Sequence, residues 1–405
     1  MPTRVTHPDS HVYRLVFLFP EVYRPLAVNF AGEFMKLSPS CTGYIFTLCS
    51  DAYRHMPISH FRLYSGRITS SSIGNFLRRL WIQTALACWI VLRGPCIHAI
   101  VTWDPYTSGL SGVFLKFLLR TKLIVQIVGD YHRMDPTEDS VGDPKAQNRI
   151  FKQIKKALMR SLFRLTVSLA DAVKVINTDL ERFIRHTYPR KPVFRFPCYV
   201  ATGYFQSLPT FQGDYLLSIG HPFYRKGVDI LIQAFKLVVR KHPHVRLRIM
   251  GYSPENELQT YRLLAANDPH IEFVRPGWIE DVAEQLRGCY ALVHAARSEA
   301  MGRVLFEAMA CRKAVVSTRT NGGIEYIEDG RSGILCEIEN VADLAEKMNH
   351  LLADHNLATR MGQVGYERVV NEFSEEKYVS SFRAMLRDIL TDSVEQLPIE
   401  RRTIA

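Results

Sequence analysis

Residues 295–325 read AARSEAMGRVLFEAMACRKAVVSTRTNGGIE, and the interpretation of the rest of the chain starts from this stretch. An apolar run that ends at His294 predicts a strand, and a helix is expected to start near 300–302 after a short loop. The first backbone amides of a helix have no partner within it. Here they belong to Ala300, Met301, Gly302 and Arg303. Because such amides and the helix dipole attract anionic oxygens, the stretch predicts a site for phosphate or another anion.

Two carboxylates accompany the start of this helix. Glu299 precedes it, and Glu307 follows eight residues later. Since two helical turns take about 7.2 residues, both can face one cleft, roughly 12 Å apart along the axis. That separation suits the two ends of an extended ligand better than a pair that exchanges one proton. The alternative is a helix-capping Glu299 and a solvated Glu307.

Short apolar runs alternate with longer helical patterns on both sides of this stretch, which is typical of parallel α/β sheets. The runs predict strands at 13–19, 44–48, 97–102, 122–128, 172–176, 215–219, 245–250, 271–274, 290–294, 314–317 and 333–336. We therefore expect an α/β protein with two doubly wound, Rossmann-like sheets. Ligands of such folds bind at the carboxyl ends of the strands, here in a central cleft.

The segment 189–209 contains four prolines and little helical period, so it predicts the linker between two domains. The first domain is then 1–205 and the second 206–374. The last helical pattern, 375–391, carries one apolar stripe and therefore needs a surface to cover. The residues of that stripe are Tyr378, Phe382, Met385, Leu386 and Ile389.

The excess of positive over negative charge in the 405-residue chain lies in its first half. Residues 1–205 hold 27 Lys and Arg against 13 Asp and Glu, a net charge of +14, whereas 206–405 hold 24 against 27, a net charge of −3. The first half is thus expected to face an acidic partner such as a membrane surface, a phosphorylated lipid or nucleic acid. A solvated basic face without a partner is the alternative.

Several classes of protein are disfavoured by what the chain lacks. A content of 47% hydrophobic residues argues against disorder. There is no G-x-G-x-x-G run for a dinucleotide oxidoreductase, and no recognisable nucleic-acid module, so no nucleic acid is expected as a partner.

The cysteine pattern and the hydrophobic segments bear on localisation. The eight cysteines form no C-x-x-C pair and read as reduced thiols of a cytosolic protein. Residues 1–12 lack the apolar core of a secretory signal, and the most hydrophobic stretch, 80–92, is shorter than the roughly 20 residues that span a bilayer. We expect a cytoplasmic protein.

Three segments of the second half resemble a known family. SEAMGRVLFEAMACRKAVVS at 298–317 resembles the E-x7-E block of the retaining glycosyltransferases of GT-B architecture, the glycosyl transferases group 1 family. SIGHPFYRKGVDILIQAF at 218–235 resembles the first strand of that family's nucleotide domain with its basic loop and Lys-Gly pair. With GRSGILCEI at 330–338, the resemblance covers 214–375. It is looser in the first half, over 103–133 and 169–184.

This resemblance implies a division of labour between the domains. Residues 1–205 would hold the acceptor and residues 206–374 the sugar nucleotide, with the helix at 375–391 packing back on the first domain. Gly129 and Asp130 match the end of a His-Gly-Asp loop on the acceptor side. Val128 stands where that loop usually has its histidine.

The resemblance also assigns roles to the residues of the donor site. Lys226 would contact the donor diphosphate and Glu307 the ribose hydroxyls. Arg225 is a candidate second cation beside Lys226, and the alternative is a solvated side chain. Glu299, with the amides of residues 300–303, would hold the transferred sugar. Gly220 and His221 complete the donor loop, and His221 replaces a usual arginine. With Val128, that replacement leaves open a catalytically impaired partner subunit that only binds the nucleotide sugar.

The expected reaction is metal-independent transfer of a hexose-type sugar with retention of configuration. Breaking a sugar–phosphate bond places negative charge on the leaving diphosphate, which a lysine and a helix N-terminus can stabilise. The chain contains no D-x-D motif, so no metal and no other cofactor is expected.

A basic segment at 149–165 indicates where the acceptor is presented. One stripe of this helical pattern is apolar and another face is basic, as in a helix that lies on anionic lipid. The apolar stripe consists of Phe151, Ile154, Leu158, Leu162 and Leu165. A core-packed helix with a solvated basic face is the alternative. On the first interpretation the protein is peripheral on the inner face of the plasma membrane, and it adds sugar to a glycan or lipid-linked acceptor in cell-surface polysaccharide or lipopolysaccharide assembly.

Overall fold

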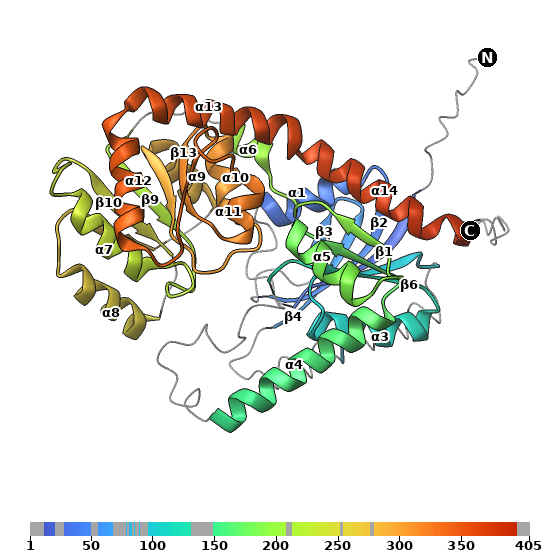
Figure 1. Ribbon diagram of the computed structural model, residues 1–405. Coiled ribbons are helices and arrows are strands. Elements are labelled where there is room, and N and C mark those ends of the chain that lie inside the picture. Colours follow the sequence, from blue (N-terminus) through green and yellow to red (C-terminus); the bar gives the residue numbers. More distant parts are fainter. Residues whose placement is uncertain are drawn as a thin grey trace, which may run out of the picture.

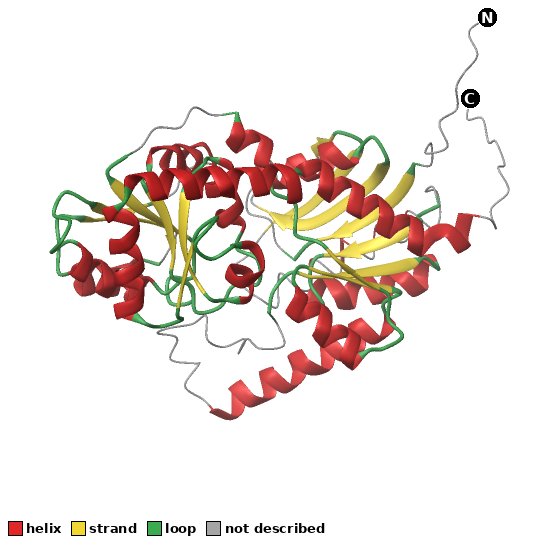
Figure 2. Cartoon of the chain, turned by 45° about the horizontal axis from the view of Figure 1, so that its top comes forward, coloured by secondary structure: helices red, strands yellow, loops and turns green. Residues whose placement is uncertain are grey.

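Two sheets flanked by helices make up the part of the chain that the structure describes (Figure 1, Figure 2). The computed structural model describes residues 12–20, 28–49, 56–67, 78, 81, 82, 85, 89, 96–130, 149–207, 213–251, 254–275 and 279–394. The prediction of an α/β fold with two doubly wound sheets is confirmed. We call the elements from β1 to β8 the N-terminal half and those from β9 to α13 the C-terminal half.

The first sheet has the strand order β3-β4-β2-β1-β5-β6-β7-β8. Its strands are β1 (Tyr13–Leu18), β2 (Cys41–Cys49), β3 (Met56–Ile58), β4 (Phe61–Arg67), β5 (Ala99–Thr102), β6 (Lys122–Ile127), β7 (Ala172–Val175) and β8 (Val193–Arg195). All neighbours are parallel except β3 and β4. The strand order reverses between β1 and β5, which places the switch point of this sheet there.

The second sheet is parallel throughout, in the order β11-β10-β9-β12-β13-β14. Its strands are β9 (Tyr215–Ile219), β10 (Arg246–Met250), β11 (Ile271–Val274), β12 (Ala291–His294), β13 (Ala314–Thr318) and β14 (Ile334–Cys336). Here the order reverses between β9 and β12. The loops that follow these two strands carry the residues that the sequence singled out.

The described helices connect the strands and cover both sheets. They are α1 (Val28–Leu37), α3 (Thr107–Leu119), α4 (Arg149–Leu169), α5 (Thr178–Thr187), α6 (Thr202–Gln206), α7 (Val228–Val238), α8 (Glu255–Ala265), α9 (Ile279–Gly288), α10 (Arg303–Ala310), α11 (Asn321–Tyr326), α12 (Val341–Ala353), α13 (His355–Glu372) and α14 (Glu375–Val394). Among the residues with defined positions, no helix is long and apolar enough to cross a membrane.

The central strands are apolar without alternation because helices cover both of their faces. All residues of β5, β7 and β12 are buried. Aliphatic side chains of these strands form the cores that hold the loops at the carboxyl ends in place.

The last helix, α14, belongs to the core of the N-terminal half although it follows the C-terminal half in the chain (Figure 1). Its side chains Tyr378, Phe382 and Met385 are buried among residues of β1, α1 and β4. The chain therefore passes between the halves twice, before α6 and again at the start of α14. The two passages touch, since Gly203 N donates to Glu375 Oε1 at 2.9 Å and Lys36 of α1 pairs with Glu375 at 2.8 Å.

The sequence missed three strands of the first sheet. A linker that starts at Pro189 is wrong, because Val193–Arg195 form β8 and pair with β7. This strand is only three residues long and lies between Pro192 and Pro197, so its composition is that of a loop. Strands β3 and β4 form a short antiparallel hairpin at the opposite edge of the sheet.

Candidate active site

A cleft of about 600 Å³ lies between the two halves, at the carboxyl ends of β1, β5 and β9. The N-terminal half contributes Phe19, Asn29, Phe30, Glu33, Trp103 and Tyr199. The C-terminal half contributes Ile219, Gly220, His221, Arg225, Lys226, Glu299, Gly302, Arg303, Val304 and Glu307. The cleft thus brings together eight of the site residues that the sequence predicted, including both carboxylates of the E-x7-E spacing.

Glu299 and Lys226 form a partly buried ion pair in this cleft. Burial raises the pKa of Glu299, but Lys226 and the neighbouring His294 outweigh burial and hold its pKa well below the usual range. His294 ends β12, and its Nε2 lies 3.3 Å from Glu299 Oε2. Burial and the nearby Lys226 lower the pKa of His294, so its imidazole is neutral at neutral pH. The site therefore holds one full positive and one full negative charge in contact.

The backbone at Gly220 lets Lys226 reach Glu299. Gly220 follows β9 with φ +143°, and a Cβ built there would lie 2.7 Å from Lys226 Cε. Any other residue would both strain the backbone and obstruct the lysine side chain. This explains why the loop after β9 begins with glycine.

Helix α10 starts at Arg303, after Gly302, which has φ +77°. Gly302 and Arg303 line the cleft, but Ala300 and Met301 do not. Ala300 O instead accepts a hydrogen bond from Asn177 Nδ2 at 2.8 Å, and Met301 Sδ accepts one from Cys198 N at 3.3 Å. Of the four residues that were expected to form an anion site, Gly302 and Arg303 therefore line the cleft. Ala300 and Met301 contact the N-terminal side of the molecule.

Glu307 is buried at the far end of the cleft and bridges the two halves. Its Oε1 accepts a hydrogen bond from Asn29 Nδ2 at 2.8 Å, while Asn29 Oδ1 accepts one from Ala201 N at 2.7 Å. Burial raises the pKa of Glu307, partly offset by Arg303 and by Asn29. The alternative of a solvated Glu307 is therefore wrong, because the side chain is buried and hydrogen-bonded.

Cations line one wall of the cleft. Arg225, Lys226 and Arg303 all come from the C-terminal half, and His221 adds a titratable ring 4.0 Å from Glu257. Arg225 Nη2 donates to His221 O at 3.4 Å, which keeps these two residues together. This wall can compensate several negative charges on a ligand.

Gly129 and Asp130, which were expected on the acceptor side, do not line this cleft. Asp130 is buried, and its Oδ1 accepts a hydrogen bond from Asn177 Nδ2 at 3.4 Å. Val128 is partly buried against the core. Asp130 lies next to the contact between the halves, because the same Asn177 Nδ2 donates to Ala300 O of the C-terminal half.

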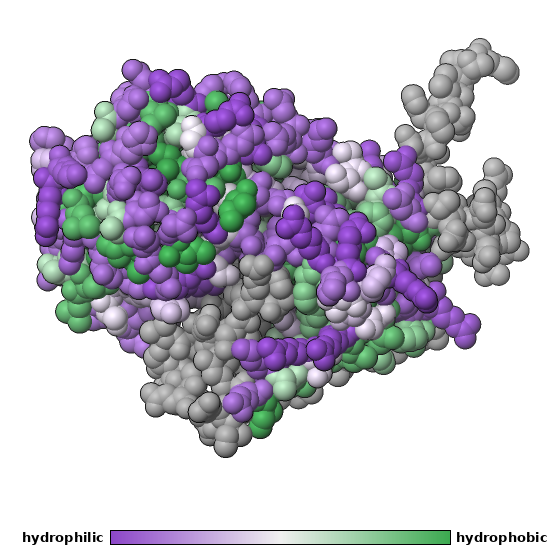
Figure 3. Space-filling view, viewed as in Figure 1, coloured by the Kyte–Doolittle hydropathy of each residue, from purple (hydrophilic) through white to green (hydrophobic). Residues whose placement is uncertain are grey.

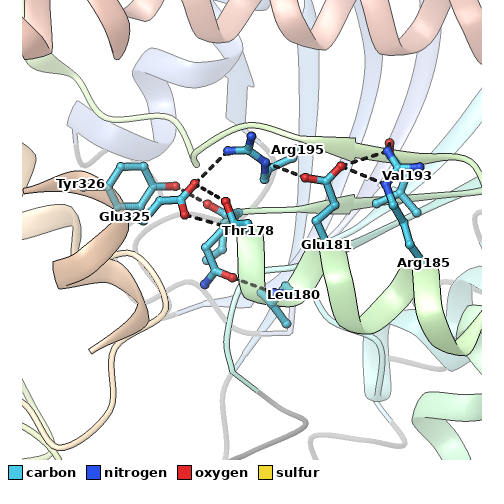
Figure 4. Close-up of polar contacts among 10 residues, drawn as sticks. Thr178, Leu180, Glu181, Arg185, Val193, Arg195, Glu325 and Tyr326 are labelled. Atoms are coloured by element: carbon cyan, nitrogen blue, oxygen red, sulfur yellow. Dashed lines mark hydrogen bonds and ion pairs between the residues drawn. The ribbon is translucent and has the colours of Figure 1, made fainter. Parts of the chain in front are cut away.

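A second set of polar contacts, which we call the seam, joins the halves beside the cleft (Figure 4). Glu325 accepts hydrogen bonds from Thr178 N and Oγ1 at 3.2 and 3.0 Å and pairs with Arg195 at 2.8 Å. Arg195 also pairs with Glu181 at 2.7 Å, so one guanidinium bridges a carboxylate of each half. Tyr326 donates its hydroxyl hydrogen to Ile176 O.

The sequence did not predict a set of buried ionisable side chains at the cleft. Glu33 of α1 lines the cleft, is only 2% exposed, and accepts a hydrogen bond from Tyr378 of α14. Burial raises the pKa of Glu33 to about 7, against the opposing effects of Tyr378, Lys174 and Arg303. Burial also lowers the pKa of Lys174, which lies 3.7 Å from Cys198 Sγ. No local motif marks these residues, because they come from four distant segments.

The second half of the chain is similar to known proteins. Residues 205–368 match the family described as glycosyl transferases group 1. An uncharacterized glycosyltransferase of Methanocaldococcus jannaschii is 34% identical over 180 residues, 44% of this chain and 50% of the relative. The lipopolysaccharide core biosynthesis glycosyltransferase of Rhizobium meliloti is 28% identical over 172 residues, 42% of this chain and 49% of the relative. The chain thus spans about half the length of the curated relatives it matches.

Solved structures share the whole architecture. The sucrose-phosphate synthase of Thermosynechococcus elongatus superposes with a TM-score of 0.74 at 19% identity and covers 94% of this chain and all of its own. HepE of Anabaena, in complex with UDP and glucose, has a TM-score of 0.65 at 14% identity, covering 95% of this chain and all of its own. The fold is therefore GT-B.

Glu33 should make the free energy of unfolding depend on pH, and the substitution Glu33→Gln should remove this dependence. Its raised pKa means that the folded protein keeps the proton up to about pH 7, whereas an unfolded carboxyl loses it near pH 4.5. The stabilisation is complete below the unfolded pKa and disappears as pH rises through 7. The unfolding free energy of wild type relative to Glu33→Gln should thus be higher at pH 5 than at pH 8, by up to about 3 kcal/mol. Urea unfolding of both proteins across this range measures it, and a pH-independent difference would contradict the assignment.

The seam should open when Glu325 is replaced. Glu325→Ala removes the acceptor of the Thr178 amide and one partner of Arg195, so amide exchange at the start of α5 should accelerate roughly tenfold or more. Hydrogen exchange with mass spectrometry follows peptides over 176–181. Glu328→Ala is the matched control, because Glu328 pairs with Arg331 within the C-terminal half. Equal exchange in both variants would show that the seam does not hold the halves together.

Proposed function

Because residues 205–368 belong to the glycosyl transferases group 1 family, we propose that this protein is a retaining glycosyltransferase that moves a hexose-type sugar from a nucleoside diphosphate sugar to a glycan or lipid-linked acceptor. One observation carries the proposal: three cations and the start of α10 line one wall of a cleft that also holds Glu299 and Glu307. A nucleoside diphosphate sugar presents two phosphates between a ribose and a sugar. Its length and charge fit this wall.

The donor would exchange partners with the ion pair of Lys226 and Glu299. When the diphosphate enters, Lys226 can turn from Glu299 toward the phosphates, which frees Glu299 to accept hydrogen bonds from sugar hydroxyls. Glu307, about two helical turns further, would bind the ribose hydroxyls in place of Asn29. In the reaction the bond between the sugar C1 and a phosphate oxygen breaks, the oxygen of the acceptor hydroxyl bonds to C1, and the proton of that hydroxyl passes to the leaving diphosphate. Lys226, Arg225 and the amide end of α10 then stabilise the negative charge on the departing diphosphate.

Two lines support the donor class and the setting. HepE, which shares the fold, was crystallised with UDP and glucose. The relative from Rhizobium meliloti acts in lipopolysaccharide core biosynthesis. We propose a role in the assembly of a cell-surface polysaccharide or lipopolysaccharide, with UDP and GDP sugars both as candidate donors.

The proposal is tested by release of nucleoside diphosphate. Purified protein, supplied with UDP or GDP sugars and candidate glycan acceptors, should release the diphosphate at the same rate in excess EDTA, because protein cations replace a metal. NMR of the product should show an α linkage from an α donor. A strict Mg²⁺ or Mn²⁺ requirement would refute the metal-free mechanism, and a β product the retention. Tight donor binding without release for any acceptor would favour the catalytically impaired partner subunit.

Lys226 and Glu307 should affect different kinetic constants. Lys226→Ala removes a cation that is needed most when the diphosphate departs, so kcat should fall on the order of 100-fold. Glu307→Ala should chiefly weaken nucleotide affinity, because a ribose contact is equal in the ground and transition states. Steady-state kinetics and calorimetry with UDP distinguish them, with the exposed Lys241→Ala as control. The reverse pattern would mean that the two assignments are exchanged.

We also propose that α4 docks the protein on an anionic membrane surface. This helix has apolar side chains on two opposite sides. Phe163 and Val167 are buried, whereas Ile154 and Leu158, which precede them by nine residues or two and a half turns, are 61% and 57% exposed. Along the lower edge of the molecule, hydrophobic side chains gather where α3 and α4 lie (Figure 3). Packing in the core explains the buried side of α4, but it does not explain the exposed apolar stripe of Ile154 and Leu158.

The neighbouring helix and the charges favour lipid as the partner. Helix α3 exposes Phe114, Phe117 and Leu118. By helical spacing, the exposed Arg160 and Arg164 of α4 border this stripe on one side, whereas Lys156 lies on the opposite side and is partly buried. Apolar side chains bordered by cations match the boundary between anionic headgroups and acyl chains.

Vesicle binding should depend on both components of this surface. Cosedimentation with anionic vesicles should exceed that with neutral vesicles and fall with salt, since each basic residue contributes about 1 kcal/mol within a Debye length of roughly 8 Å. Ile154→Ser with Leu158→Ser, and separately Arg160→Gln with Arg164→Gln, should each reduce it. Arg331→Gln with Arg360→Gln, in the C-terminal half, is the matched control. Equal binding to neutral and anionic vesicles would contradict the proposal.

A further inference from the structure

Three of the four aromatic side chains that line the cleft from the N-terminal half are packed around Phe19, and we call these three the aromatic wall. They are Phe19, Phe30 and Trp103. The ring of Phe19 lies 5.0 Å from that of Phe30 and 4.9 Å from that of Trp103, measured between centroids. Phe19 and Trp103 directly follow β1 and β5, and Phe30 lies in the first turn of α1. The wall therefore sits at the switch point of the first sheet, where ligands of such folds bind.

The aromatic wall is held in a fixed arrangement from behind. Phe34 is fully buried and contacts Phe19 and Phe30 edge-on, with centroids 6.0 and 5.1 Å away. Phe34 in turn packs on Phe17 and Phe61 of the core. Phe30 and Trp103 are only partly buried, so they present surface to the cleft. A rigid apolar surface of this kind loses little entropy when it binds a ligand.

The two walls differ in the cations that they carry. Among the described residues that line the cleft from the N-terminal half, none is Lys, Arg or His, and the ionisable carboxyl is Glu33. All the cations come from the C-terminal half. An acceptor that carries phosphate or carboxylate would find aromatic rings and a carboxyl at the N-terminal wall, with no cation to replace its water.

We propose that the aromatic wall binds a neutral sugar ring of the acceptor and disfavours phosphorylated or carboxylated ones. The inference rests on the proposed function, because it takes the opposite wall as the donor site. A pyranose has one face of C–H groups, which pack on the negative face of an aromatic ring, and a rim of hydroxyls. Asn29 and Glu33, beside the rings, offer an amide and a carboxyl for those hydroxyls.

Saturation-transfer NMR tests this with methyl glycosides. Methyl α-D-glucopyranoside and methyl α-D-galactopyranoside are the neutral probes, and glucose 6-phosphate and glucuronic acid the anionic ones, each with and without UDP. The neutral probes should receive saturation on their C–H face, and the anionic probes at least fivefold less. Trp103→Ala and Phe30→Ala should each reduce the neutral signal at least fivefold, whereas Trp103→Phe should retain most of it. Trp81→Ala, which removes an exposed tryptophan outside the cleft lining, should change nothing.

UDP binding, measured by calorimetry on the same proteins, separates the two proposals. The aromatic-wall variants should bind UDP as wild type does. If UDP binds and the anionic probes match or exceed the neutral ones, or if Trp103→Ala leaves the neutral signal intact, the aromatic wall is not a neutral-sugar site. If UDP does not bind but the neutral-probe signal still depends on Trp103, the proposed donor site is contradicted and the proposed sugar site on the aromatic wall is supported.

Discussion

The contacts of Glu325 join the two halves of the molecule beside the cleft that lies between them. A carboxylate of the C-terminal half accepts hydrogen bonds from the first residue of α5 and pairs with Arg195 at the end of β8. Next to it, Asn177 caps α5 by accepting from Leu180 N and also donates to Ala300 O of the opposite half. Each residue thus completes a local structure and an interface at once. Such contacts specify orientation, because they are satisfied at one relative position of the halves.

The two walls of the cleft, one from each half, differ chemically. The wall after β9 and β12 gathers lysine, arginine and a helix N-terminus, and the wall after β1 and β5 gathers aromatic rings. This difference has a simple origin. The first wall is built from polar loops that enter helices with free amides, while the second consists of residues that continue an apolar core up to the edge of the sheet. The net charge of the first half, which is strongly positive, is therefore not concentrated in the described lining of its cleft wall but is found elsewhere, for example on α4.

Much of the C-terminal half could be predicted from the sequence, because its signals are local. Strands β9 and β11 were placed at the observed bounds, and the residues around Lys226 and Glu299 meet since both follow neighbouring strands at a switch point. The N-terminal wall could not be predicted in this way. Asn29, Glu33, Trp103 and Tyr199 come from three segments without a shared motif, and only the tertiary fold brings them together. Similarly, β8 is a strand only because β7 offers it a partner, since three residues among prolines have no strand pattern of their own.

The two contacting passages of the chain between the halves have a mechanical consequence. Because Gly203 and Glu375 are hydrogen-bonded to each other, both covalent connections run through nearly the same place. Two rigid bodies joined along one short line keep a single easy motion, which is rotation about that line. Twisting and sliding are restricted by the chain itself. Residues near this axis, such as Tyr378 and Tyr199, would move little relative to each other, whereas the tips of both walls would travel furthest. An opening of the cleft would then be a rotation about the line where the two passages touch.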